Sequence, residues 1–213
     1  MRRAVLWDFD GVLFPTEGLR DETHQEVVHA LGGQISPDFY RKIKGAGRAH
    51  EEVRAEFIQA SGIKATPEKY TRIFQKVFQQ KLRSLAPTPG VMKTLCRLQT
   101  RRYLQAVVSS SPRLEVLPPL VRAGLVPFFD TVVCGDDVIR PKPAPDGYLK
   151  AVADLETQSL AGVAVEDSWS GVEAASTAGL KVITFRHEYN LDHDFSKACQ
   201  VVIELTEIPE RTS

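Results

Sequence analysis

Polar side chains suited to phosphoryl chemistry follow several apolar runs of this sequence, at the points where the runs end. They are Asp8 and Asp10 after residues 4–7, Ser109 and Ser110 after residues 104–108, and Glu166 and Asp167 after residues 162–165. Gly11 follows Asp10, and Lys142 stands in a proline-rich loop between two of the runs. If the runs are parallel strands, these side chains meet at one edge of a sheet, because open parallel sheets bind ligands at the carboxyl ends of their strands. We therefore expect a single site that combines carboxylates, hydroxyls and a lysine.

Each of these side chains has a task in phosphoryl transfer. Asp8 is ionised near pH 7 and can attack phosphorus without the help of a base. Asp10, two residues later, can protonate the leaving oxygen and then deprotonate the attacking water. Lys142 and the Ser109 hydroxyl, helped by backbone N–H groups near Ser110, can hold the phosphoryl oxygens. The predicted catalytic residues are therefore Asp8, Asp10, Ser109 and Lys142.

The carboxylates also supply the hard oxygen ligands that a divalent cation prefers. The predicted Mg²⁺ ligands are Asp8, Asp10, Glu166 and Asp167. The sequence leaves open which of the adjacent pair, Glu166 or Asp167, binds the ion directly. A cation would cancel the repulsion between the attacking carboxylate and a phosphate dianion. This interpretation requires the carboxylates of residues 8 and 167 to lie close together.

The apolar runs and the segments between them predict the elements that position these residues. Strands are expected at residues 4–7, 104–108, 131–134, 162–165, 182–185 and 201–203. Helix start signals separate the later runs, at Thr88-Pro89, Ser111-Pro112, Pro145, and Ser168 or Ser170. The Pro118-Pro119 pair predicts a kink or break in the second of these helices. Alternating strands and helices predict an α/β fold with a mostly parallel sheet.

One long segment interrupts this alternation. Residues 16–86 show helical patterns alone, directly after the first strand, and proline stands at both borders. We interpret the segment as a helical bundle that sits over the sheet. The predicted domains are a catalytic core of residues 1–15 and 87–213, and a helical cap of residues 16–86.

The four functional segments together resemble the motifs of the haloacid dehalogenase superfamily of aspartyl-phosphate phosphotransferases. They are Trp7-Asp8-Phe9-Asp10-Gly11-Val12-Leu13, Val107-Val108-Ser109-Ser110-Ser111, Pro141-Lys142-Pro143, and Val165-Glu166-Asp167-Ser168 with Gly171. The resemblance covers essentially the whole chain, because the helical insert is similar to the family's cap. It implies a Rossmann-like doubly wound core, Mg²⁺, an aspartyl-phosphate intermediate, and a cap that opens and closes.

Departures from the family pattern narrow the expected reaction to hydrolysis of a small phosphomonoester. Members that cleave carbon–halogen or carbon–phosphorus bonds lack the second aspartate of the first motif, which is Asp10 here. Sugar-phosphate mutases are the main alternative, and residues 44–48 resemble their substrate-gripping loop. The mutases usually carry a histidine where this chain has Arg20, although His24 one turn later is a possible substitute. A non-catalytic binding protein on the same fold is the third hypothesis.

The substrate contacts expected from this resemblance lie in both domains. The predicted substrate-binding residues are Gly11, Glu17, Lys44, Arg48 and Ser110. Each motif also has a plainer interpretation: the aspartates and serines as turn or cap residues, Lys142 as a solvated loop lysine, and His24 as a packing residue. It is the joint occurrence of the four motifs that favours the catalytic interpretation.

Composition restricts the class of protein and its partners. Twenty-seven basic residues balance twenty-seven acidic ones, which argues against nucleic acid as the main partner. The three cysteines are widely spaced, so neither a disulfide framework nor a zinc site is expected. No apolar run approaches the length of a membrane span, and the apolar stretch near the start is too short for a signal peptide. We expect a monomeric cytoplasmic enzyme that acts on a small-molecule phosphate ester.

Overall fold

Six parallel strands form the sheet of the computed structural model, which describes residues 3–43, 50–156 and 162–208. The strands are β1 (Ala4–Trp7), β2 (Leu104–Val108), β3 (Thr131–Val133), β4 (Gly162–Glu166), β5 (Lys181–Phe185) and β6 (Gln200–Val202). Every one lies within a residue of its predicted position. Their spatial order is β3-β2-β1-β4-β5-β6, so the chain builds outward from β1 on one side and then crosses to the other. Ligands of such sheets bind at this switch point, beside β1.

Helices cover both faces of the sheet, as a doubly wound fold requires. They are α5 (Val91–Thr100), α6 (Arg113–Arg122), α7 (Asp146–Asp154) and α8 (Trp169–Thr177). Successive residues of a strand point to opposite faces. On β1, Val5 and Trp7 pack with α5 and α6, whereas Ala4 and Leu6 pack with α7 and α8. Burial on both faces explains why the strands are continuous apolar runs in the sequence.

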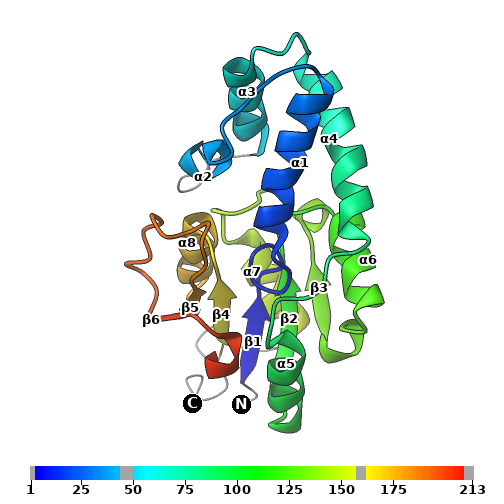
Figure 1. The fold of residues 1–213 in the computed structure, drawn as a ribbon. Coiled ribbons are helices and arrows are strands. Elements are labelled where there is room, and N and C mark those ends of the chain that lie inside the picture. The colour runs from blue at the N-terminus through cyan, green and yellow to red at the C-terminus, as the bar shows by residue number, and fades with distance from the viewer. Residues whose placement is uncertain (1–2, 44–49, 157–161, 209–213) are drawn as a thin grey trace.

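The helical insert lies above the carboxyl ends of the strands (Figure 1). Its helices are α1 (Thr16–Ala30), α2 (Phe39–Ile43), α3 (His50–Ser61) and α4 (Pro67–Leu82). It has an apolar cluster of its own, drawn from all four helices and centred on Phe57, Tyr70 and Phe74. Thr66 caps α4 by accepting the Lys69 N–H, and Pro67 takes the first helical position. The borders of these helices agree with the expected cap of residues 16–86, which stays a prediction as a domain boundary.

Two helix expectations were wrong in detail. Helix α6 continues through Pro118 and Pro119 without a break, although each proline leaves a carbonyl one turn earlier without its helical donor. Helix α5 begins at Val91 rather than at Pro89, and its N-cap is Gly90 with φ +86°. Short 3₁₀ helices lie at Val126–Phe128, Gly135–Asp137 and Leu205–Glu207. Within the described ranges, no helix combines the length and the apolar character that crossing a membrane requires.

Candidate active site

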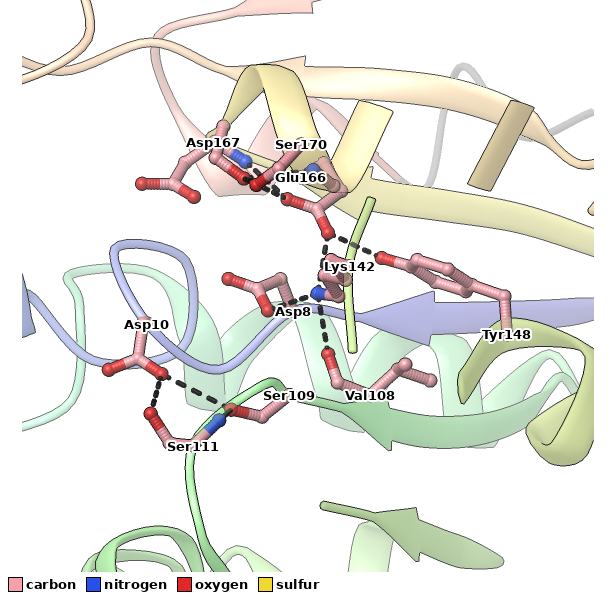
Figure 2. Close-up of polar contacts among 12 residues, drawn as sticks. Asp8, Asp10, Val108, Ser109, Ser111, Lys142, Tyr148, Glu166, Asp167 and Ser170 are labelled. Atoms are coloured by element: carbon pink, nitrogen blue, oxygen red, sulfur yellow. Dashed lines mark hydrogen bonds and ion pairs between the residues drawn. The ribbon is translucent and has the colours of Figure 1, made fainter. Parts of the chain in front are cut away.

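The strand register brings the first and fourth motifs side by side. Trp7 on β1 pairs with Val165 on β4, so Asp8 and Glu166 follow at the same level of the sheet. Asp8 still belongs to the ladder, because its N–H donates to the Val165 carbonyl at 2.9 Å. The chain then turns sharply at Gly11, whose φ of +75° favours glycine. This turn places Asp10 on a different side of the site from Asp8 (Figure 2).

Lys142 lies at the centre of the carboxylate cluster (Figure 2). Its ammonium donates to Asp8 Oδ1 at 2.5 Å, to Glu166 Oε1 at 2.6 Å and to the Val108 carbonyl at 2.9 Å. Burial alone would lower the pKa of Lys142, but the two carboxylates together raise it above its usual value. Lys142 is therefore a fixed cation shared by two buried anions.

Asp8 is an unfavourable place for a negative charge without a metal. Burial raises the pKa of its carboxyl, and the carboxylates of Glu166 and Asp167 raise it further. The opposing effect of Lys142 is smaller than these together, so the pKa stays well above its usual value. A divalent cation beside Asp8 would restore the balance of charge.

Glu166 supports the site rather than lining it. Its side chain is fully buried and both oxygens are occupied. Oε1 accepts from Lys142 and from the Tyr148 hydroxyl at 2.6 Å, while Oε2 accepts from the Asp167 N–H at 3.1 Å and the Ser168 hydroxyl at 3.3 Å. Gly171 leaves room for it, since a Cβ there would lie 1.9 Å from the carboxylate. Glu166 thus orients Lys142 and the start of α8.

The donor set fits a hard divalent cation such as Mg²⁺. One carboxylate oxygen from each of Asp8, Glu166 and Asp167 can be chosen so that all lie within 4.8 Å of one another, and all three residues are buried. Mg²⁺ is bound in proteins by one or two carboxylates together with water and substrate phosphate. Because Glu166 is already saturated by hydrogen bonds, Asp8 and Asp167 are the better placed pair. The hydrogen bonds thus favour Asp167 over Glu166 as the residue that would bind the ion directly.

Asp10 is held apart from this cluster by four donors. Its Oδ1 accepts from the Thr16 hydroxyl at 2.8 Å and from Arg20 at 3.1 Å. Its Oδ2 accepts from the Ser111 hydroxyl at 2.7 Å and the Ser109 hydroxyl at 3.2 Å. Burial alone would raise the pKa of Asp10, but Arg20 and the hydroxyls lower it below its usual value. The expected side-chain metal contact of Asp10 does not fit this arrangement, because both oxygens are taken by other partners.

The residues expected to contact substrate have different environments. Glu17 is buried and accepts a hydrogen bond from the Tyr40 hydroxyl at 2.7 Å. Ser110 is exposed, next to Ser109 in sequence. Gly11 lies against Asp167, within the site. Lys44 and Arg48 fall outside the described residues.

His24 belongs to the interior of the helical insert and not to the site. Its ring stacks on Phe57 at 4.2 Å between centroids, and its Nδ1 lies 2.9 Å from the Tyr70 hydroxyl. Burial lowers the pKa of His24 to about 3, so the ring is neutral. The suggestion that His24 substitutes for the mutase histidine is therefore wrong. On α1 it is Arg20, together with Thr16, that reaches Asp10.

Three functional neighbours were not identified from the sequence: Thr16, Tyr148 and His187. Thr16 and Tyr148 sit on helices, and nothing in the sequence shows that their hydroxyls reach Asp10 and Glu166. His187 comes shortly after β5 and lies 2.9 Å from Asp167 Oδ2. Asp8, Asp10, Ser109, Glu166 and Asp167 were found by inspecting the positions that follow each strand, and the same rule applied to β5 would have found His187 as well.

Gly11→Ala should damage both the fold and metal binding. A Cβ at residue 11 would lie 2.0 Å from Asp167 Oδ2, and its φ of +75° costs a non-glycine residue about 1–2 kcal/mol. Gly124→Ala is the matched control, since it has a φ of +67° and nothing within 4 Å. Urea denaturation with and without Mg²⁺ should show a similar backbone cost in both variants, but loss of the Mg²⁺-dependent gain only in Gly11→Ala. An equal Mg²⁺ response in the two would contradict the contact with Asp167.

Comparison with known proteins agrees with this geometry. The haloacid dehalogenase-like hydrolase model matches residues 5–185. The phosphorylated carbohydrates phosphatase of Thermotoga maritima is 35% identical over 84% of this chain and 83% of that protein. Crystal structures of CbbY from Rhodobacter sphaeroides are similar to the whole chain. The complex with phosphate is 27% identical, covers 98% of this chain and 96% of its own and has a TM-score of 0.80.

A second CbbY structure, of a variant bound to xylulose-(1,5)bisphosphate, is 27% identical, covers 97% of this chain and 96% of its own, and has a TM-score of 0.81. The resemblance inferred from the four motifs is thus confirmed by a match that spans the first strand, the insert and the strands up to β5. The expected enzyme class, a hydrolase, is confirmed with it. The chain belongs to the haloacid dehalogenase-like hydrolases.

Proposed function

We propose that the chain is a Mg²⁺-dependent phosphatase that hydrolyses a small phosphomonoester through a phosphoryl group carried on Asp8. The observation that supports this most directly is the position of Asp8, buried between Lys142 and the carboxylates of Glu166 and Asp167 at the switch point of the sheet. Relatives named as phosphatases support the same conclusion, and one of them is named for phosphorylated carbohydrates. A phosphorylated sugar is the substrate class we favour.

In the first step, an Asp8 oxygen attacks phosphorus while the bond from phosphorus to the ester oxygen breaks. Oδ1 accepts from Lys142, so Oδ2 is the oxygen proposed to form the new bond. The leaving oxygen takes the electron pair together with a proton from the protonated Asp10 carboxyl and departs as an alcohol, which leaves Asp10 ionised. Mg²⁺ held by Asp8 and Asp167 would supply positive charge that offsets the repulsion between carboxylate and phosphate.

In the second step, water attacks the phosphorus of the aspartyl phosphate. Asp10 accepts the water proton, the bond to Asp8 breaks, and inorganic phosphate leaves with Asp8 regenerated. The lowered pKa of Asp10 keeps it ionised, which suits the base role. To serve as the acid of the first step Asp10 must carry a proton, which requires its release from Thr16 and Arg20, two of the partners that keep it ionised. Both belong to α1, so a shift of the proposed cap, residues 16–86, would free it.

A screen of phosphorylated sugars and other small phosphate esters tests the proposal. We expect inorganic phosphate to be released in the presence of Mg²⁺ and the release to stop in excess EDTA. Formation of a sugar-phosphate isomer that requires a bisphosphate activator would show a mutase instead, although the burial of His24 argues against that reaction. A protein that stays inert on the whole panel would favour the non-catalytic hypothesis.

A further inference from the structure

The turn after β5 is built around Asp167. Strands β4 and β5 are neighbours, with Glu166 paired to Thr184, so the residues that follow β5 lie beside those that follow β4. Residues 187–190 form this turn, and the Asn190 N–H donates to the His187 carbonyl at 3.2 Å. Two of its side chains, His187 and Asn190, contact Asp167.

Asn190 fixes the backbone at this point. It is almost fully buried, and its Nδ2 donates to the Asp167 carbonyl at 2.8 Å and to the Phe185 carbonyl at 2.9 Å. Its Oδ1 accepts the His187 N–H at 2.9 Å. The amide therefore ties the ends of β4 and β5 together and holds His187 in place. A buried amide that uses both its donor and its acceptor sides gives a well-defined geometry.

The hydrogen bonds of the His187 ring determine which nitrogen carries the proton. The Tyr189 N–H donates to His187 Nδ1 at 3.2 Å, so Nδ1 is an acceptor and the ring proton is on Nε2. Nε2 then donates to Asp167 Oδ2 at 2.9 Å. Among the described residues, His187 is the only side chain that donates to the Asp167 carboxylate. The ring thus holds one oxygen of this carboxylate without requiring a positive charge.

Gly11 lies against the same oxygen and leaves space for it. A Cβ at residue 11 would lie 2.0 Å from Asp167 Oδ2 and 3.1 Å from His187 Nε2, so the absent side chain makes room for this hydrogen bond. With Oδ2 held there, Oδ1 is the oxygen left to bind a cation together with Asp8. Hydrogen bonds from outside the ligand set commonly orient metal ligands in this way.

We propose that His187 is a positioning residue that presents Asp167 to the metal, an inference that rests on the proposed Mg²⁺-dependent function. It acts through Asp167 and not on the substrate. Removing its donor should weaken Mg²⁺ binding by about 10–100-fold, the usual effect of losing such a contact. Saturating Mg²⁺ should recover most of kcat, because the catalytic groups themselves remain.

His187→Leu and His187→Gln form the test pair. Leucine removes the donor, whereas the Gln side-chain amide can place an N–H near the position of Nε2. Mg²⁺ binding to the substrate-free protein, measured by calorimetry and by the rise of Tm with Mg²⁺, should be weakened in His187→Leu and substantially restored in His187→Gln. Wild-type affinity in His187→Leu, or equal losses in the two variants, would overturn the proposal.

Glu188→Gln is the matched control from the same turn. Glu188 is exposed and pairs with Arg41 of α2 at 2.5 Å, so the change alters a contact with the insert and leaves Asp167 alone. We expect Glu188→Gln to bind Mg²⁺ like the wild type. A loss equal to that of His187→Leu would attribute the effect to the turn as a whole and overturn the proposal. The metal titrations need no substrate, so a failure of the proposed phosphatase activity is seen separately.

Discussion

Asp8→Asn should abolish turnover, by at least about 10⁴-fold, while the protein keeps its fold. An amide does not attack phosphorus as a carboxylate does, and losing a nucleophile costs an enzyme most of its rate. Release of inorganic phosphate from the best substrate of the screen, measured at saturating Mg²⁺, checks the prediction. Circular dichroism on the same sample separates loss of chemistry from loss of structure. Turnover near the wild-type rate would exclude Asp8 as the phosphoryl carrier.

The same variant should be more stable than the wild type when no metal is present. The raised pKa of Asp8 means that its ionised form opposes folding at neutral pH, so the neutral amide should stabilise the metal-free protein by about 1 kcal/mol. Lys142 keeps Glu166 and the Val108 carbonyl as partners. The extra stability of Asp8→Asn should shrink as the pH falls from the raised pKa of Asp8 towards the ordinary pKa of an aspartate. Over this range the wild-type carboxyl becomes neutral in the folded protein too.

Urea denaturation in EDTA at pH 7 and at pH 4 measures this difference. The comparison also tests the electrostatics of the site independently of catalysis. A metal-free Asp8→Asn protein that is less stable than the wild type at pH 7 would show that the ion pair with Lys142 outweighs burial and the neighbouring carboxylates. That outcome would leave the proposed nucleophile in place and change only the account of its charge.

The core of the fold could be predicted from the sequence because its strands are buried on both faces. Runs such as 104–108 contain little besides apolar residues and end abruptly at polar ones. The same abrupt ends located Asp8, Glu166 and Asp167, since a parallel sheet gathers the residues at the carboxyl ends of its strands. Hydrophobic periodicity and sheet topology were sufficient for this part of the site.

The roles within the site depended on side-chain directions that spacing does not encode. Glu166 and Asp167 are adjacent in sequence, yet one is saturated by Lys142 and Tyr148 whereas the other faces the site. The partners of Asp10 come from α1 and from the loop after β2, and Arg20 reaches a residue ten positions earlier. Such contacts follow from how the insert packs on the core, which no local pattern specifies.

The two aspartates that precede the loop of Lys142 also make contacts that could not be predicted from the sequence. Asp136 and Asp137 lie in a 3₁₀ turn shortly after β3. Their further task was not visible in the sequence: Asp136 accepts the backbone N–H of Arg113 at 3.0 Å at the start of α6, and Asp137 pairs with the Arg113 side chain. These carboxylates fix the start of a helix that borders the site.

Lys142→Met should have the largest effect on stability. It leaves Asp8 and Glu166 as buried anions without their shared cation, and removing one partner of a buried ion pair costs about 3–5 kcal/mol. Lys150→Met is the matched control on α7, because Lys150 is exposed and pairs along its helix with Asp154, where such pairs contribute about 0.3–0.5 kcal/mol. Urea denaturation in EDTA measures both. A small loss in Lys142→Met would show that the two carboxylates are already neutral in the metal-free protein.

Mg²⁺ should reverse part of this loss, because a second cation can stand beside the same carboxylates. We expect Mg²⁺ to stabilise Lys142→Met more than it stabilises the wild type, while turnover stays roughly 10²–10³-fold lower because charge is no longer balanced in the transition state. The double variant Asp8→Asn, Lys142→Met shows whether the stability lost in Lys142→Met comes from the charge of Asp8 or from that of Glu166. If Lys142 mainly neutralises Asp8, Asp8→Asn should stabilise the Lys142→Met background by more than it stabilises the wild type, since it then removes an unpaired anion at residue 8. Additive effects would mean that Lys142 acts through Glu166 instead.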